Sequence, residues 1–166
     1  MPNTSIFLDA GTTVMSLVRQ LPNQHYTIVT SGANIAIELS QRSRSTVSCV
    51  GGQISSSTLS LSGPQAEAFL ATVNIDTAVL AATGYSAGAG FTVGSYTENS
   101  LKRRVIQKAD KVILLIDRSK LGRTLPFTFA SLSDIDVVIC DAPLPEDFIQ
   151  AARAAGTEVL QVQPAR

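Results

Sequence analysis

The sequence has little of what several classes of proteins depend on. No apolar run reaches the roughly 18–20 residues of a transmembrane helix, and Met1 is followed by polar residues and a strand-like stretch instead of a leader. Lys and Arg total 13 and Asp and Glu also total 13, so the chain lacks the basic surplus typical of a domain that reads DNA. We therefore expect a cytoplasmic protein with no membrane contact and no direct attraction of this chain to nucleic acid.

Cysteine and histidine are also scarce. The two cysteines, Cys49 and Cys140, lie in apolar, strand-like runs, which argues against a disulfide framework and predicts buried thiols in a reducing cytosol. His25 is the only histidine, and because it lies in a polar connection we interpret it as a surface residue and not a catalytic one. We predict no bound cofactor and no metal site.

What the sequence does contain is one well-cored unit. Its 166 residues, 45% of them hydrophobic, have the size of a single domain that buries roughly two-thirds of its unfolded surface. Strand-like and helix-like segments alternate: strands are expected at 6–8, 26–30, 46–50, 75–81, 112–116, 137–140 and 158–162, helices at 14–21, 35–41, 65–72, 98–108 and 145–155, and a short edge element at 127–130. The alternation predicts an α/β fold, a single three-layer α/β/α domain over residues 1–166 with a mainly parallel sheet.

The first strand is followed by a turn suited to an anion. Residues 6–8 read as a buried strand, Asp9 follows it, and Gly11 can adopt the positive φ of a sharp turn. Thr12 and Thr13 then fall where a helix begins, so two hydroxyls, free N–H groups and the helix dipole would meet there. The alternative is a plain strand-to-helix turn with a good cap.

Glycines and hydroxyl residues mark further candidate sites after later strands. Thr30-Ser31-Gly32 repeats the order of strand, hydroxyl, glycine and helix, and Gly51-Gly52 indicates either a bulge or a close approach of the backbone. Segment 83–97, which contains Gly84 and three more glycines, is the most loop-like part of the chain. It lies between a strand and a helix, where α/β proteins keep binding residues.

Charged residues form two more candidate groups. Glu98 and Lys102 are one turn apart on the helix expected at 98–108, which predicts an i,i+4 ion pair, whereas Arg103 and Arg104 read as a solvated face. Asp117-Arg118-Ser119-Lys120 follows the fully apolar strand at 112–116, a run typical of the inside of a parallel sheet. Charges at the carboxyl end of a buried strand point to a site more strongly than charges on a helix face.

Taken in order, these motifs resemble the effector-binding domain of the DeoR family over nearly the whole chain. The matching segments are 7–13, Gly51-Gly52, Gly63, the glycine-rich loop, Glu98-x-x-x-Lys102, Asp117-x-Ser119-Lys120, 132–136 and Asp141. Members of that family are bacterial transcription regulators of sugar metabolism with an N-terminal winged helix-turn-helix. The resemblance implies that this chain is a fragment, that operator DNA is bound through a missing N-terminal domain, and that the regulator is a homo-oligomer, a dimer or a tetramer.

The effector domain of that family is similar in fold to ribose-5-phosphate isomerase, glucosamine-6-phosphate deaminase and the CoA transferases. The resemblance implies a phosphate pocket at the first turn, extended by the second turn, with Lys120 at the sugar or its phosphate and Asp9, Glu98 and Lys102 nearby. The complete predicted ligand-binding set is Asp9, Gly11, Thr12, Thr13, Thr30, Ser31, Gly51, Gly52, Gly84, Glu98, Lys102, Asp117 and Lys120. At one position the sequence departs from the family, which often has Asn where Ser31 stands.

Three functions fit such a fold: a sensor of a phosphorylated sugar, a sugar-phosphate isomerase or deaminase, and an unrelated nucleotide-binding domain. Isomerisation needs a base within reach of a carbon-bound proton, and in the isomerase acids follow the fourth strand. Here the corresponding segment, 81–88, contains no acid, and His25 is poorly placed to substitute. The first turn also lacks the full Gly-x-Gly-x-x-Gly fingerprint of dinucleotide binding. We therefore predict a phosphorylated-sugar sensor without catalytic residues, with the isomerase or deaminase as the alternative.

Overall fold

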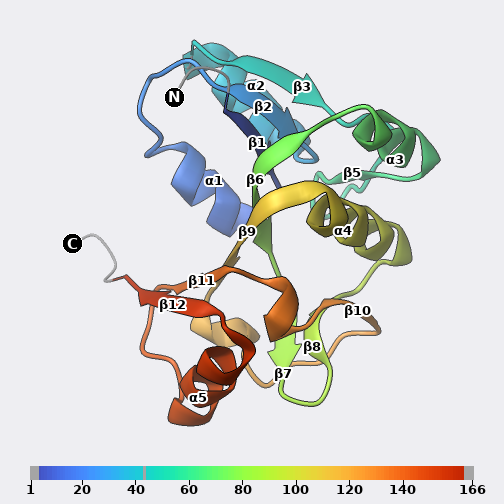
Figure 1. Ribbon diagram of the computed structural model, residues 1–166. Coiled ribbons are helices and arrows are strands. Elements are labelled where there is room, and N and C mark those ends of the chain that lie inside the picture. The colour runs from blue at the N-terminus through green and yellow to red at the C-terminus, as the bar shows by residue number, and fades with distance from the viewer. Residues whose placement is uncertain (1–3, 43, 163–166) are drawn as a thin grey trace.

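The centre of the domain is a parallel sheet, here in a computed structural model that describes residues 4–42 and 44–162. Within this part of the chain, seven strands pair in the order β12-β11-β9-β6-β1-β2-β3 (Figure 1). Their bounds are β1 Ser5–Leu8, β2 Thr27–Thr30, β3 Thr46–Cys49, β6 Ile75–Ala81, β9 Ala109–Ile116, β11 Val137–Cys140 and β12 Glu158–Gln161. Each neighbouring pair is parallel, which confirms the predicted sheet.

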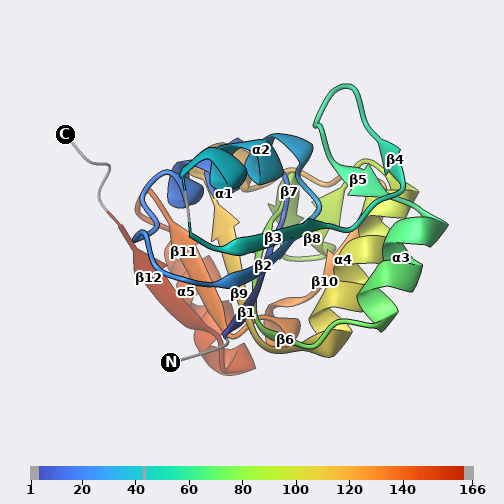
Figure 2. The same cartoon turned by 90° about the horizontal axis from the view of Figure 1, so that it is seen from above.

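Helices cover both faces of this sheet (Figures 1 and 2). Helices α1 (Thr12–Val18) and α2 (Ala33–Arg42) pack their buried residues with Leu8 in one core cluster. Helices α3 (Pro64–Ala71), α4 (Tyr96–Lys108) and α5 (Glu146–Ala155) pack against the opposite face in a larger cluster that contains Phe7. Adjacent strand residues thus point to opposite faces, as the pleat requires, and the three-layer prediction is confirmed.

The strand order reverses between β1 and β6. From β1 the chain builds β2 and β3 on one side, and it then returns to build β6, β9, β11 and β12 on the other. In register, Phe7 pairs with Ala78 and Leu8 pairs with Val79, so the residues that follow these two strands emerge at the same edge of the sheet. Ligands of open α/β sheets bind at such a reversal, outside the carboxyl ends of the strands.

Segment 83–97 is not a loop, and that prediction was wrong. It contains β7 (Gly84–Ser86) and β8 (Gly90–Val93), which form a small antiparallel sheet with β10 (Phe127–Ala130), and α4 begins within it at Tyr96. The glycines allow tight packing: a Cβ at Gly84 would lie 2.5 Å from the carbonyl oxygen of Arg123, and one at Gly90 would lie 2.5 Å from that of Ala130. The same residues that suggested a loop are therefore required by a packed hairpin.

Smaller corrections have local causes. Cys140 is buried as predicted, but Cys49 is exposed because β3 is an edge strand. Helix α1 ends at Val18 instead of continuing to Leu21, shortly before Pro22, whose ring disfavours helical backbone in the preceding residue. The remaining elements are a hairpin of β4 (Gln53–Ile54) and β5 (Leu61–Ser62) and the short helices η1 (Arg118–Lys120) and η2 (Leu132–Asp134). Among the described residues, no helix is long and apolar enough to span a membrane.

Candidate functional site

Asp9 lies at the carboxyl end of β1, beside the strand reversal. Only 4% of it is exposed. Its Oδ1 accepts hydrogen bonds from the N–H of Ala10 at 2.9 Å and from the hydroxyl of Ser31 at 3.3 Å, and its Oδ2 accepts one from the N–H of Ala81 at 3.0 Å. One carboxylate therefore connects the ends of β1, β2 and β6.

Lys102 completes this cluster from α4. Its ammonium forms an ion pair with Asp9, donates to the carbonyl oxygen of Ala81 at 2.9 Å and lies 5.3 Å from the centre of the Phe129 ring. Only 7% of Lys102 is exposed. A buried carboxylate and a buried ammonium neutralise each other here, and each has further hydrogen bonds, as such groups require.

The predicted ion pair between Glu98 and Lys102 is absent from the described residues, where Lys102 binds Asp9 instead. Glu98 accepts hydrogen bonds from the hydroxyls of Thr58 at 3.1 Å and Ser60 at 2.5 Å, in the segment between β4 and β5. The two residues are one turn apart, but the long lysine side chain turns to the buried carboxylate, which has more to gain from a counter-charge than half-exposed Glu98.

Thr30 and Ser31 are buried, and their side chains are occupied within the protein. The hydroxyl of Thr30 donates to the carbonyl oxygen of Leu8 at 2.7 Å and accepts from the N–H of Gly32 at 3.0 Å. The hydroxyl of Ser31 donates to Asp9. These hydrogen bonds hold the second turn against the first. Thr30 and Ser31 therefore support the structure of the proposed site.

The first turn has the geometry that the sequence predicted. Gly11 has φ +120°, and α1 begins at Thr12 with its first helical hydrogen bond from Met15 to the carbonyl oxygen of Gly11 at 3.0 Å. Among the described residues no side chain caps this turn, so within that part of the chain the N–H groups of the first helical residues have neither an intrahelical nor a side-chain partner. Thr12 is exposed and Thr13 is half-buried, so this turn reaches the surface of the domain.

The other three glycines of the predicted set differ in role. A Cβ at Gly52, which has φ +90°, would lie 2.3 Å from the carbonyl oxygen of Ser62, so of the two predicted alternatives, a bulge or a close backbone approach, the close approach holds at Gly52. Gly51 has φ +80° and open space around it. Gly84 is buried under residues 123–125, and its requirement for a small side chain comes from that packing.

Asp117 and Lys120 follow the carboxyl end of β9, the strand that pairs with β6. Asp117 caps η1 by accepting from the N–H of Ser119 at 2.9 Å and from the Ser119 hydroxyl. Nζ of Lys120 is 4.0 Å from Oδ2 of Asp117, and about a third of each side chain is exposed, 31% and 32%. The Lys120 ammonium is therefore only loosely paired, in contrast to that of Lys102.

Sequence reasoning missed Asn34, in the first turn of α2. Its Oδ1 is buried and has no hydrogen-bond partner among the described residues. Asn34 follows the second turn of the site by a few residues, and a polar residue in a first helical turn carried no signal that set it apart. The described residues contain no group of His, Cys, Asp or Glu arranged to hold a metal ion.

Comparisons with known proteins identify the family of the chain. A model of the family described as "DeoR C terminal sensor domain" matches residues 1–142. The chain is 36% identical over 156 residues to the HTH-type transcriptional regulator GlpR of Haloferax volcanii, covering 93% of this chain and 61% of that protein. It is 31% identical to the HTH-type transcriptional repressor GlcR of Bacillus subtilis, covering 93% of this chain and 60% of the repressor. It thus spans about 60% of the length of these curated relatives.

One solved structure with a similar fold is ribose 5-phosphate isomerase A of Methanocaldococcus jannaschii. The TM-score is 0.50 with 16% sequence identity, over 74% of this chain and 48% of the isomerase chain. At this identity the likeness establishes the fold alone.

Proposed function

The chain belongs to the family of DeoR C-terminal sensor domains, and we propose that it binds a phosphorylated sugar as the effector of a transcriptional repressor of sugar metabolism. Binding would shift an attached helix-turn-helix domain between states of different affinity for operator DNA. Because palindromic operators match symmetric proteins, we further propose that the regulator acts as a homodimer or homotetramer. The relatives named as HTH-type regulators support the role of the domain, and the effector class is argued from the site.

The observation that carries this proposal is the uncapped first turn of α1 at the strand reversal. Gly11, Thr12 and Thr13 offer backbone N–H groups and two hydroxyls, and the helix dipole adds partial positive charge there. Lys120 supplies the loosely held cation of the site, because Lys102 is neutralised by Asp9. This combination favours a phosphate over an uncharged ligand end. Asp117, Asn34 and Glu98 are then the candidates for contacts with sugar hydroxyls.

An isomerase or deaminase would need a free carboxylate or another base at this edge of the sheet. Each acid of the predicted ligand-binding set already has a partner: Asp9 is bound to Lys102, Glu98 accepts two hydroxyl hydrogen bonds, and Asp117 caps η1. The hairpin after β6, residues 84–93, contains no acid and no histidine. This arrangement supports a sensor over a catalyst, and we propose that the domain does not turn over its ligand.

A thermal-shift panel of phosphorylated sugars, each paired with its free sugar, tests the proposed function. A ligand that binds the native state raises the unfolding temperature by mass action. We expect at least one sugar phosphate to stabilise the domain and its free sugar to have a much smaller effect. Equal stabilisation by both members of every pair would contradict the phosphate anchor, and steady conversion of a stabilising ligand would contradict the sensor.

A further inference from the structure

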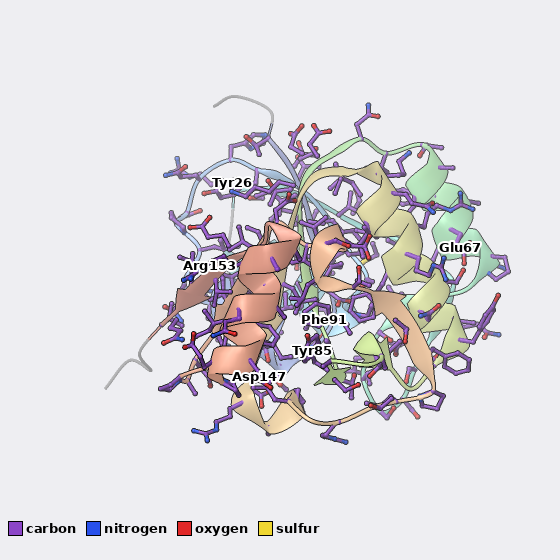
Figure 3. The ribbon with its side chains drawn as sticks, turned by 60° about the horizontal axis from the view of Figure 1, so that its bottom comes forward. Tyr26, Glu67, Tyr85, Phe91, Asp147 and Arg153 are labelled. Carbon is purple, nitrogen blue, oxygen red and sulfur yellow. The ribbon has the colours of Figure 1, made fainter. Side chains whose placement is uncertain are left out.

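A cleft lies between β7, the turn after η1 and the first half of α5. Its volume is about 440 Å³. The wall is aromatic: the ring of Tyr85 lies 4.8 Å from that of Phe148 at 74°, and 4.8 Å from that of Phe91 on another side. Tyr85 is held firmly by these contacts and is only 7% exposed. In Figure 3, Asp147 lies at the end of α5 nearer to Tyr85, and Arg153 lies at the other end.

The cleft has few polar side chains, and none of them in the described lining is basic. The Tyr85 hydroxyl forms no hydrogen bond with the described residues, and burial and, to a smaller extent, the charge of the exposed Asp147 carboxylate raise the pKa of Tyr85. Ser86 adds a hydroxyl, and the described lining contains no lysine, arginine or histidine. A phosphate would meet a like charge here, whereas sugar hydroxyls would find an acceptor carboxylate and a phenol that can donate.

The cleft and the proposed anion site share one segment of chain. Leu121, which follows Lys120, lines the cleft and forms a parallel β-bridge with Tyr85. The N–H of Gly122 donates to the carbonyl oxygen of Tyr85 at 2.8 Å. Lys120 and the cleft are therefore neighbours along the chain, joined through Leu121.

We propose that this cleft recognises the uncharged, hydroxyl-bearing end of a carbohydrate, through the rings of Tyr85 and Phe148 and the carboxylate of Asp147. Ligand sites typically combine an apolar wall with a few placed polar groups, and an aromatic ring with a polar tip suits a carbohydrate, which has both C–H faces and hydroxyls. The inference rests on the proposed function for the position of the phosphate. The cleft itself can be tested with uncharged sugars alone.

The test uses the whole chain with isotope-labelled tyrosine rings, observed by NMR near neutral pH in phosphate-free buffer. The chain has 3 tyrosines, Tyr26, Tyr85 and Tyr96, and Tyr85→Phe identifies the Tyr85 signals by their loss. Glycerol, ribose, glucose and galactitol are titrated as free probes, followed by sugar phosphates. We expect at least one free probe to move the Tyr85 signals saturably and to leave those of the other two tyrosines in place.

Two variants of neighbouring acids provide the matched comparison. Asp147→Asn should weaken binding of the free probe by roughly 10–150-fold, as expected for the loss of a hydrogen bond to a charged group. Glu146→Gln changes an adjacent exposed acid that does not line the cleft, and it should leave the affinity unchanged.

The outcomes separate this inference from the proposed function. If sugar phosphates bind but the Tyr85 signals stay fixed with every ligand, the cleft proposal is wrong and the sensor proposal stands. If free sugars move Tyr85 in a way that depends on Asp147, but phosphates bind no better, the cleft proposal stands and the phosphate anchor is wrong. If no probe moves Tyr85 and no phosphate binds, both are wrong.

Discussion

Lys102 and Asp9 form an ion pair in the interior of the domain although 93 residues separate them in sequence. The pair joins α4 to the carboxyl end of β1, and the hydrogen bond from Lys102 to Ala81 includes the end of β6. These are the two strands between which the sheet order reverses. The pair therefore holds the ends of β1 and β6 in place at the proposed effector site.

Lys102→Met is expected to destabilise the domain by about 3–5 kcal/mol, because it leaves the Asp9 carboxylate buried without a counter-charge. Urea unfolding measures the change in free energy. The neighbouring Arg103→Met, on the exposed face of α4, should stay within about 0.5 kcal/mol of the parent. Adding Asp9→Asn to Lys102→Met should recover part of the loss, since the uncompensated charge is then removed. Equal stability of the Lys102 and Arg103 variants would show that the ion pair does not hold the site.

Gly52→Ala should cost more stability than Gly51→Ala. Both residues have positive φ, which costs an alanine about 1–2 kcal/mol. Only at Gly52 would the new Cβ collide with a backbone oxygen, that of Ser62, which should add about 1–3 kcal/mol. Thermal unfolding of the two variants compares them directly, and a larger loss at Gly51 would contradict the described contact between this turn and β5.

The sequence predicted the sheet well because each main strand is an apolar run with its own local signal. The segment 112–116 is an example: it lies within β9 and packs as predicted, although β9 begins earlier, at Ala109. The hairpin of β7 and β8 could not be predicted in this way, because its glycines are selected by contacts with residues far along the chain. Cys49 shows the same limit, since the apolar run around it gave no sign that β3 would be an edge.

The sequence predicted the local geometry of a single turn of the candidate site. It did not predict contacts between segments that are far apart in the chain. Gly11 has the positive φ that a glycine after the first strand suggested. The i,i+4 spacing on the helix predicted Glu98 as the partner of Lys102. That spacing considers only residues of the same helix, so it could not point to Asp9, which comes from the end of β1. Asn34 and the cleft at Tyr85 went unnoticed for a related reason: an unpaired amide oxygen and an aromatic wall exist only once the chain has folded.

The phenol of Tyr85 should titrate above the ordinary pKa of 10.0, because burial raises its pKa and the charge of Asp147 raises it further. In the unfolded chain the phenol ionises near its ordinary pKa while the native state keeps the proton, so the free energy of unfolding falls as the pH rises above about 10. Tyr85→Phe should remove this part of the pH dependence, and Asp147→Asn should lower the Tyr85 pKa. Absorbance titration measures the phenol, and an unchanged Tyr85 pKa in Asp147→Asn would show that the two groups do not interact.

The measurement that tests the sensor account most directly is calorimetric titration of Lys120→Ala and Lys111→Ala with a stabilising sugar phosphate and its free sugar. Lys111 lies exposed near the amino end of β9, the strand after which Lys120 follows, so it controls for the loss of one positive charge. We predict that Lys120→Ala weakens phosphate binding by roughly 10–150-fold, that Lys111→Ala leaves it unchanged, and that the free sugar binds the parent and both variants with similar, low affinity. Unchanged affinity of a folded Lys120→Ala protein, or equal affinity of the parent for the sugar and its phosphate, would contradict the account.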